Sequence, residues 1–468
     1  MPTDPKKKAQ TKAKSQAKKQ VKKAARKNPA LFIALVVVVV VIVAVAAVLY
    51  LKVPAIHDAV NNVIHKNDSN SSSNNSGNGG SNGGSGNGGN GNSDLVIGDG
   101  ELKVYFFDVG QGDCIYIQFP DGKDMLIDCG NKSSGFSFKD FKKYFDTLNP
   151  DGNIDHLMLT HGDEDHVEYL DDIVNAYRIF NIYMPNILSD PLKNPDYNKK
   201  ESTKKNCDNL KAQIDNLDPE KLAKFQDPDT LYSAVYANFF IAALSEENCK
   251  IYLNVDADDE HNSIIISDES TYELKFYCMT VAGWAKNTLK NAHEKNEISP
   301  VGILTYNGKR IVLTGDSNEE NEPEIAARIG HIDCDVLKVA HHGSETSSMP
   351  VFLDAVTCEY AIISCNARGN TFYHPRQETL DRLIARNYTI FRTDLNGNIV
   401  ATIDGDGNLT IAPDNEAPVS LIHNGISNEE ASILTEYNSR KNEKGISTDE
   451  KEKRTKEYDD KLTEFLGY

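Results

Sequence analysis

The chain has 468 residues, with 50 Lys or Arg against 69 Asp or Glu, and its formal net charge is −19. This acidic balance argues against a protein that holds long DNA on a basic surface, because such binding depends on the release of counterions from many phosphates. The eight cysteines are scattered along the chain and lack the spacing of a disulfide framework.

The first part of the chain has a composition of its own. Residues 1–28 carry eleven Lys or Arg and one acid, and the stretch from Leu31 to Leu51 is apolar apart from one Tyr. Because this stretch matches the hydrocarbon thickness of a bilayer, we expect one transmembrane helix at 29–52 in the cell membrane. The basic tail would stay in the cytoplasm and the rest of the chain would be extracytoplasmic. Residues 67–94, almost wholly Asn, Gly and Ser, predict a disordered linker.

Residues 95–413 alternate strand and helix patterns, which predicts one large α/β domain. Strands are expected at 103–107, 114–119, 125–129, 154–159, 180–184, 263–266, 273–279, 301–306, 310–313, 336–339, 360–364 and 389–392, and helices at 139–148, 170–177, 321–329 and 378–386. Residues from about 188 to 254 are interpreted as an insertion, because polar helices replace the alternation there. Many strands with interspersed helices favour two sheets sandwiched between helical layers.

Residues 414–468 form a charged tail. Tyr458, Leu462 and Phe465 give it a thin apolar stripe at helical spacing, and acids alternate with basic residues along it. This pattern predicts a solvated helix, with a helix that binds a protein partner as the alternative.

The cysteine positions leave one pair to consider. Cys358 and Cys365 are seven residues apart on what is predicted to be one strand, so they face opposite ways and cannot pair with each other. Cys207 and Cys249 both lie in the insertion, and they are the pair in which a disulfide would be sought.

A cluster of metal-binding side chains follows one predicted buried strand. Residues 157–166 read LMLTHGDEDH, so His161, Asp163, Asp165 and His166 lie within six positions. Two histidines and two carboxylates in one loop would repel each other and lose solvation if they were buried without a cation. The sequence therefore predicts a metal site, and a solvated acidic loop is the alternative.

Two later predicted strands end in the same chemistry. The strand at 310–313 runs into Asp316, and the strand at 336–339 runs into His341 and His342. Each motif alone is typical of a turn or of solvated histidines. Because three strand ends carry ligand-type residues, we expect them to meet at one site.

These motifs resemble, in order, those of the metallo-β-lactamase superfamily, and most closely those of the soluble domain of ComEC-type competence proteins. The motifs are FDVGQGDC at 107–114, LIDCG at 126–130, THGDEDH at 160–166, LTGD at 313–316, VLKVAHHGS at 336–344 and IISCNARGNTFYHP at 362–375. Together they span most of residues 102–411. The resemblance implies an α/β fold, the αββα metallo-β-lactamase sandwich, with two divalent metal ions at its edge.

The resemblance also implies a ligand set. Site one would use His161, Asp163 and Asp316, and site two would use Asp165, His166 and His341, with Asp316 bridging. Asp128 would orient a ligand histidine, although a strand-end turn explains it equally well. Asn296 and Ser299 stand where many hydrolases of the superfamily place a third histidine, and His261 and His293 are weaker candidates for that role. The first site is therefore rich in oxygen ligands, and manganese becomes competitive with zinc.

The chemistry that the resemblance implies is hydrolysis by a metal-bound hydroxide. Asp165 would orient the hydroxide, while His342 and His374 would contact the substrate or protonate the leaving group. Asn370 and Ser344 would donate hydrogen bonds beside them. For His374 the alternative is a turn residue before a proline.

We therefore expect a membrane-anchored, metal-dependent hydrolase. A phosphodiesterase or nuclease is favoured, because ComEC-type domains are thought to degrade DNA and two metals suit displacement at phosphorus. The substrate would be DNA or a small phosphodiester, and the small diester suits the acidic composition better. Hydrolysis of β-lactams, lactones or other acyl substrates is the second hypothesis. A non-catalytic binding module tethered to the surface is the third.

Overall fold

The computed structural model describes residues 100–130, 132, 136–225, 233–253, 264–267, 271–278 and 295–468. They belong to one compact unit that extends from Gly91 to Tyr468. The expected basic tail, the transmembrane helix at 29–52 and the linker lie outside the described residues, as do His261 and His293. Within the described ranges, no helix is both long enough and apolar enough to cross a bilayer.

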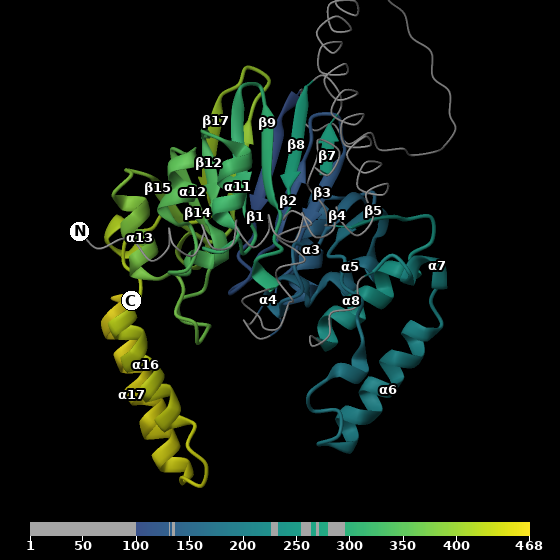
Figure 1. The fold of residues 1–468 in the computed structure, drawn as a ribbon. Coiled ribbons are helices and arrows are strands. Elements are labelled where there is room, and N and C mark those ends of the chain that lie inside the picture. The colour runs from purple at the N-terminus through teal and green to yellow at the C-terminus, as the bar shows by residue number, and fades with distance from the viewer. Residues whose placement is uncertain are drawn as a thin grey trace, which may run out of the picture. The chain divides into compact units, whose positions relative to one another are not determined.

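Two β-sheets form the centre of this unit (Figure 1). The first has eight strands in the order β17-β16-β1-β2-β3-β4-β5-β6, and the second has seven in the order β15-β14-β12-β10-β9-β8-β7. The first sheet contains β1 (Leu102–Phe106), β2 (Ile115–Gln118), β3 (Asp124–Ile127), β4 (Asn153–Met158), β5 (Arg178–Met184), β6 (Lys250–Leu253), β16 (Ile399–Ile403) and β17 (Leu409–Pro413). The second contains β7 (Ile264–Ser267), β8 (Tyr272–Tyr277), β9 (Val301–Tyr306), β10 (Lys309–Leu313), β12 (Val336–Lys338), β14 (Tyr360–Ile363) and β15 (Thr389–Arg392). A further pair joins β11 (Ile332–Asp333) to β13 (Val356–Thr357).

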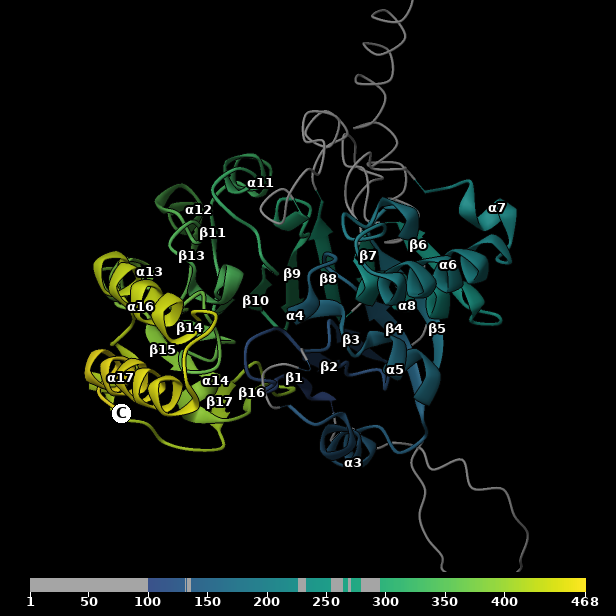
Figure 2. The same cartoon turned by 90° about the horizontal axis from the view of Figure 1, so that it is seen from below.

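Helices cover the outer face of each sheet (Figure 2). The first sheet is covered by α3 (Phe138–Leu148), α5 (Leu170–Ala176) and α8 (Ala234–Ser245), and the second by α11 (Glu322–Ile329), α12 (Pro350–Ala355) and α13 (Gln377–Ile384). One apolar cluster lies between the sheets and one lies under each helical layer. The predicted mixed α/β fold of two sheets between helices is confirmed.

Strand β1 shows how the sequence produces these layers. Leu102, Val104 and Phe106 are fully buried in the cluster between the sheets, whereas Tyr105 belongs to the cluster under the first helical layer. Alternate side chains of a strand point to opposite faces, so a strand buried on both faces is apolar at nearly every position. Apart from Lys103 the strand is apolar, which places it in the interior of the sandwich.

The predicted insertion is shorter in the structure than the range 188–254. β6 pairs in parallel with β5, and α8 buries Phe239 and Phe240 against the first sheet. Both elements therefore complete the domain. The segment that lies to the side of the layers in Figure 1 contains η3 (Pro191–Lys193), α6 (Glu201–Asp215) and α7 (Pro219–Leu222).

The charged tail forms helices, but its apolar stripe is not solvated. After the short helices α14 (Thr393–Asn396) and α15 (Val419–Ile422) come α16 (Asn428–Lys441) and α17 (Thr448–Leu466), which lie side by side (Figure 2). Tyr458, Leu462 and Leu466 of α17 are buried in one cluster with Tyr373 and Ala367 of the preceding domain. The stripe therefore packs against a loop of its own chain.

The cysteine pairing also differs from the expectation. Cys334 and Cys358 form a disulfide with a Cα–Cα distance of 4.6 Å, whereas Cys207, Cys249 and Cys365 are free. Each bonded cysteine lies two residues before a strand, and β12 pairs in parallel with β14, so the two positions are opposite each other. This register between distant strands cannot be read from cysteine spacing in the sequence.

Candidate metal centre

Three loops bring the ligand-type side chains together. The loop after β4 carries His161 and leads into α4 (Glu164–Val167), the loop after β10 carries Asp316, and η4 (Ala340–Gly343) follows β12. β4 belongs to the first sheet and the other two strands to the second. The site therefore exists only when the two sheets are packed together.

The backbone of η4 aims two consecutive histidines at one place. His341 and His342 have φ values of 50° and 53°, and Gly343 has a φ of 83°. The left-handed conformation costs a non-glycine residue about 1–2 kcal/mol. A side chain at Gly343 would place its Cβ 2.7 Å from the Cβ of Pro375, so the turn requires glycine at that position. Such local strain is typical of functional loops.

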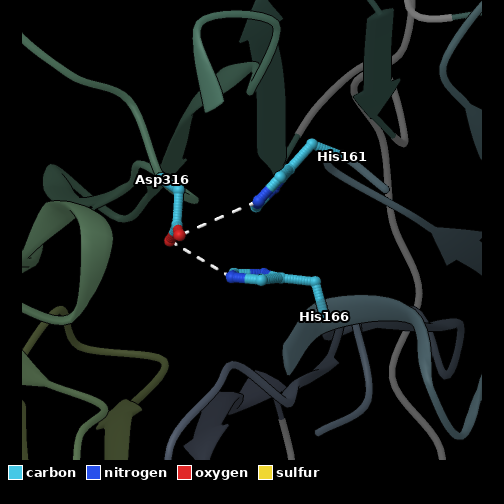
Figure 3. A group of neighbouring side chains, drawn as sticks. All are labelled: His161, His166 and Asp316. Atoms are coloured by element: carbon cyan, nitrogen blue, oxygen red, sulfur yellow. Dashed lines mark ion pairs between the residues drawn. The ribbon is translucent and has the colours of Figure 1, made fainter. Parts of the chain in front are cut away.

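The carboxylate of Asp316 lies at the centre of the cluster (Figure 3). Its Oδ1 is 3.2 Å from Nε2 of His166 and 3.4 Å from Nε2 of His342. Its Oδ2 is 3.8 Å from Nε2 of His161 and 3.7 Å from Nε2 of His341. Four imidazoles thus present the same ring nitrogen to one carboxylate that is 2% exposed.

Hydrogen bonds on the far side of the rings fix which nitrogen faces the centre. Nδ1 of His166 is 2.7 Å from Oδ2 of Asp128, and Nδ1 of His342 is 2.9 Å from the carbonyl oxygen of Ser364. These oxygens accept hydrogen bonds, so each Nδ1 donates and each neutral ring keeps its lone pair on Nε2. The two Nε2 atoms are 3.2 Å apart. When both rings are neutral only acceptors meet there, so the residues fit a divalent metal ion that takes the place of the protons.

His161, His166 and Asp316 form one group of possible metal ligands. A second group consists of Asp165, His166 and His342. Oδ2 of Asp165 is 3.3 Å from Nε2 of His342. The prediction placed His341 among the ligands and kept His342 for the substrate; in the structure His342 lies in this group, and His341 also faces Asp316. His342 is fully buried, whereas the His341 side chain is 20% exposed and its Nε2 lies 3.2 Å from Nδ2 of Asn296. The left-handed turn therefore brings both rings to Asp316, with His342 the more deeply buried of the two.

Asp163 lies at the edge of the cluster. Its Oδ2 is 3.8 Å from Nε2 of His161, and its Oδ1 accepts a hydrogen bond of 2.5 Å from Nζ of Lys295. Lys295 was not among the predicted site residues, because a lone lysine has no distinctive sequence signal. Asp163, which was predicted as a ligand of the first site, therefore also forms an ion pair with a lysine.

Two further predicted residues hold the ligands from behind. Asp128 is fully buried and accepts hydrogen bonds from the Thr160 amide at 2.8 Å and from the Thr160 hydroxyl at 2.6 Å, in addition to its contact with His166. Ser299 Oγ lies 3.3 Å from Nδ1 of His161 and accepts a hydrogen bond from the Asp316 amide at 3.2 Å. Both side chains fix the direction of rings that face the centre.

The remaining predicted residues lie outside the group around Asp316. The His374 ring is buried 5.3 Å from the His341 ring. Asn370 donates to Gln111 Oε1 at 2.9 Å and shapes its own loop. The hydroxyl of Ser344 lies 3.1 Å from Oγ1 of Thr346, so the structure does not bring it to the cluster.

A buried ion pair beneath the histidines was not predicted. Nζ of Lys338 is 2.9 Å from Oδ1 of Asp113, and the two side chains are 0% and 1% exposed. The same carboxylate oxygen is 3.5 Å from Nδ1 of His342. The sequence held a signal for this pair, since Lys338 interrupts the apolar run VLKV and Asp113 belongs to the motif FDVGQGDC.

Electrostatic effects favour the charged forms of His342 and Asp165 and the neutral form of His341. Burial alone lowers the pKa of His342, but the charge of Asp316 and a hydrogen bond to Asp165 raise this pKa to about 10. Burial raises the pKa of Asp165, but the hydrogen bond to His342 and the charge of His166 bring it below its usual range. Burial lowers the pKa of His341. The inner group therefore binds positive charge strongly, and His341 stays neutral.

An open pocket of about 680 Å³ lies beside the cluster. Its wall includes Asp163, Asp165, Lys295 and Phe372. These residues come from the loop after β4, from the segment before β9 and from the loop after β14. Asp165 therefore belongs both to the cluster and to the wall of the pocket.

Comparisons with known proteins agree with the motifs. Residues 107–228 match the family model Lactamase_B, described as the metallo-beta-lactamase superfamily. ComE operon protein 3 of Bacillus subtilis (strain 168) is 24% identical over 313 residues, which cover 64% of this chain and 33% of that protein. Competence protein ComA of Neisseria gonorrhoeae is 37% identical over 105 residues, which cover 22% of this chain and 15% of that protein. The chain thus spans a third or less of the length of these curated relatives.

A solved structure is also similar. The metallo-beta-lactamase fold protein YhfI from Bacillus subtilis matches 67% of this chain and 99% of its own, at 11% sequence identity and a TM-score of 0.34. The family match and the curated relatives confirm the resemblance that the motifs indicated.

Divalent metal should stabilise the protein more strongly as the pH rises. Without metal, the pKa of His342 is raised from its ordinary value of 6.5 to about 10 in the folded state. Its proton therefore stabilises the folded state fully below about pH 6.5, and this contribution is lost as the pH rises through about 10. A metal ion binds the deprotonated ring, so its effect grows over the same range. Thermal unfolding at about pH 6 and about pH 8, with chelator or with added Mn²⁺ or Zn²⁺, measures both trends.

The matched variants for this experiment are His166→Gln and His331→Gln. The first should abolish most of the gain in melting temperature, and the second should retain it because the His331 side chain is 64% exposed and lies outside the cluster. An equal gain in both variants would contradict binding at the cluster.

Replacing one partner of the buried ion pair should destabilise the protein. Lys338→Met leaves the Asp113 carboxylate buried without its cation, which costs about 3–5 kcal/mol in the free energy of unfolding. The double variant Asp113→Leu/Lys338→Met should recover much of that loss, because no unpaired charge remains. Urea denaturation of both variants measures the difference, and equal stabilities would show that the pair does not act as a unit.

Proposed function

Because the chain carries a metallo-β-lactamase domain, we propose that it is a metal-dependent phosphodiesterase or nuclease. The main support is the convergence of four imidazoles and Asp165 on the buried carboxylate of Asp316. This donor set suits two divalent cations, zinc or manganese. When bound, such cations activate water and neutralise charge that develops on the substrate.

The chain's own residues would divide the remaining work. Asp165 lines the pocket and its lowered pKa keeps it ionised, so it can accept a hydrogen bond from the attacking water. His374 has a lowered pKa because of burial, so it is neutral and can donate one N–H to a substrate oxygen. Lys295 in the pocket wall can attract a phosphate.

The oxygen-rich part of the site favours phosphorus over acyl carbon as the electrophile. Asn296 and Ser299 occupy the segment where many hydrolases of the superfamily would supply a histidine, and they hold His341 and His161 instead. Asp163 and Asp316 contribute oxygen on the same side. Hard cations prefer such oxygen ligands and commonly serve phosphoryl chemistry.

Turnover should depend on Asp316. We expect Asp316→Asn and Asp165→Ala to lower kcat by more than about 100-fold on labelled single-stranded DNA, double-stranded DNA or a generic phosphodiester, since removing a metal ligand costs more than removing its support. Asp333→Asn is the matched control, because that carboxylate is 88% exposed and contacts the side chains of His331 and Thr357, which are outside the cluster. Hydrolysis of a β-lactam or lactone without any phosphodiesterase activity would contradict this proposal.

We also propose that the domain acts outside the membrane, anchored by the apolar segment at 29–52. The support is the sequence alone: basic residues precede the apolar segment, and a linker at 67–94 follows it. Protease added to intact cells should therefore degrade the domain while a cytoplasmic marker protein persists. Complete protection of the domain until the cells are lysed would contradict the topology.

A further inference from the structure

One large apolar side chain is displayed at the edge of the pocket. Phe372 is 63% exposed, and it lines the same pocket as Asp165 and Lys295. An exposed phenylalanine contributes nothing to the core, since apolar side chains stabilise a fold by leaving water. Its place beside catalytic-type residues points instead to contact with a ligand.

The loop that carries Phe372 is held firmly. The side-chain oxygen of Asn370 accepts hydrogen bonds from the amides of Phe372 and Tyr373 at 2.8 and 2.6 Å, and its Nδ2 donates to Gln111. Nη1 of Arg376 donates to the carbonyl of Phe372 at 3.3 Å. Tyr373 is 2% exposed and packs with α17. The backbone that carries the ring is therefore already fixed, so a ligand that binds the ring causes little further loss of conformational entropy.

Ring contacts connect Phe372 to the candidate metal centre. Its ring is stacked on His374, with centroids 6.0 Å apart and an angle of 13° between the planes. The His374 ring is 5.3 Å from the His341 ring, whose Nε2 is 3.7 Å from Asp316. A flat group on Phe372 would thus lie a short distance from a phosphate at the cluster, with Lys295 in the same pocket wall.

We propose that Phe372 is a stacking platform for a nucleobase of the substrate. The inference rests on the proposed phosphodiesterase function and names its substrate class, nucleotides with an unpaired base. Stacking needs no basic surface, so it provides affinity that a chain with a net charge of −19 does not obtain from phosphate contacts alone. Every base has a flat face, so stacking on Phe372 would select nucleotides with an unpaired base but would not discriminate among base sequences.

The test compares two substrates and three variants of the whole chain with manganese bound. The substrates are a labelled single-stranded oligonucleotide and the same oligonucleotide with abasic residues throughout. Phe372→Ala should raise KM for the first about ten-fold or more, and leave KM for the second within about two-fold. Phe372→Trp should retain the wild-type KM. Val419→Ala is the matched control, because Val419 is also 63% exposed but does not line the pocket.

A binding measurement makes the result independent of turnover. In an Asp165→Ala background, the anisotropy of the labelled oligonucleotide should report a Kd that weakens about ten-fold with Phe372→Ala and does not change with Val419→Ala. Competition by thymidine monophosphate would indicate a mononucleotide site, and competition only by an unlabelled oligonucleotide would indicate a site that needs a strand. Competition by either of these two ligands supports a base platform.

Two outcomes would overturn the inference in distinguishable ways. Equal effects of Phe372→Ala on the normal and abasic oligonucleotides would remove the stacking role while leaving the phosphodiesterase function intact. Failure of the wild-type protein to cleave either oligonucleotide or any phosphodiester would remove the proposed function, and this inference with it.

Discussion

The attraction between the Asp316 carboxylate and the imidazoles around it is the interaction on which the rest of the site depends. A carboxylate that is 2% exposed is costly unless positive charge compensates it. Four Nε2 atoms at 3.2 to 3.8 Å surround it, and each neutral ring offers a lone pair there. Without a metal, the carboxylate raises the pKa of His342, so a proton on that ring compensates the charge. A divalent cation compensates the carboxylate and also binds the lone pairs of the neutral rings.

The fold supplies a rigid frame for this arrangement. Loops from both sheets contribute to the cluster, so the apolar cluster between the sheets also fixes the distances among the ligands. Beneath the rings, Asp128 and the Asp113–Lys338 pair form a buried polar layer that fixes His166 and His342. Such a layer gives no large gain in stability by itself, but it determines ring directions. The tail helices extend the same frame by packing against Tyr373, beside the exposed Phe372.

Most long apolar elements could be predicted from the sequence, because period-two alternation and helical spacing are local properties. Several short or atypical elements could not. β6 has only four residues and none of them is fully buried, and β16 and β17 are defined by their pairing with β1 and with each other. α8 is apolar on nearly all sides, so its sequence did not show that it covers a sheet. The disulfide between Cys334 and Cys358 depends on the register of β12 with β14.

The chemical character of the site could be read from local sequence: His161, Asp165, His166 and Asp316 follow apolar strands, and this pattern indicates metal ligands. Only the packed tertiary structure brings both adjacent histidines to Asp316, because left-handed φ values at consecutive residues are not encoded in residue type. It also decided that a lysine in strand β12 meets an aspartate more than two hundred positions away. Motifs specify which groups are present, and packing of distant segments specifies which groups touch.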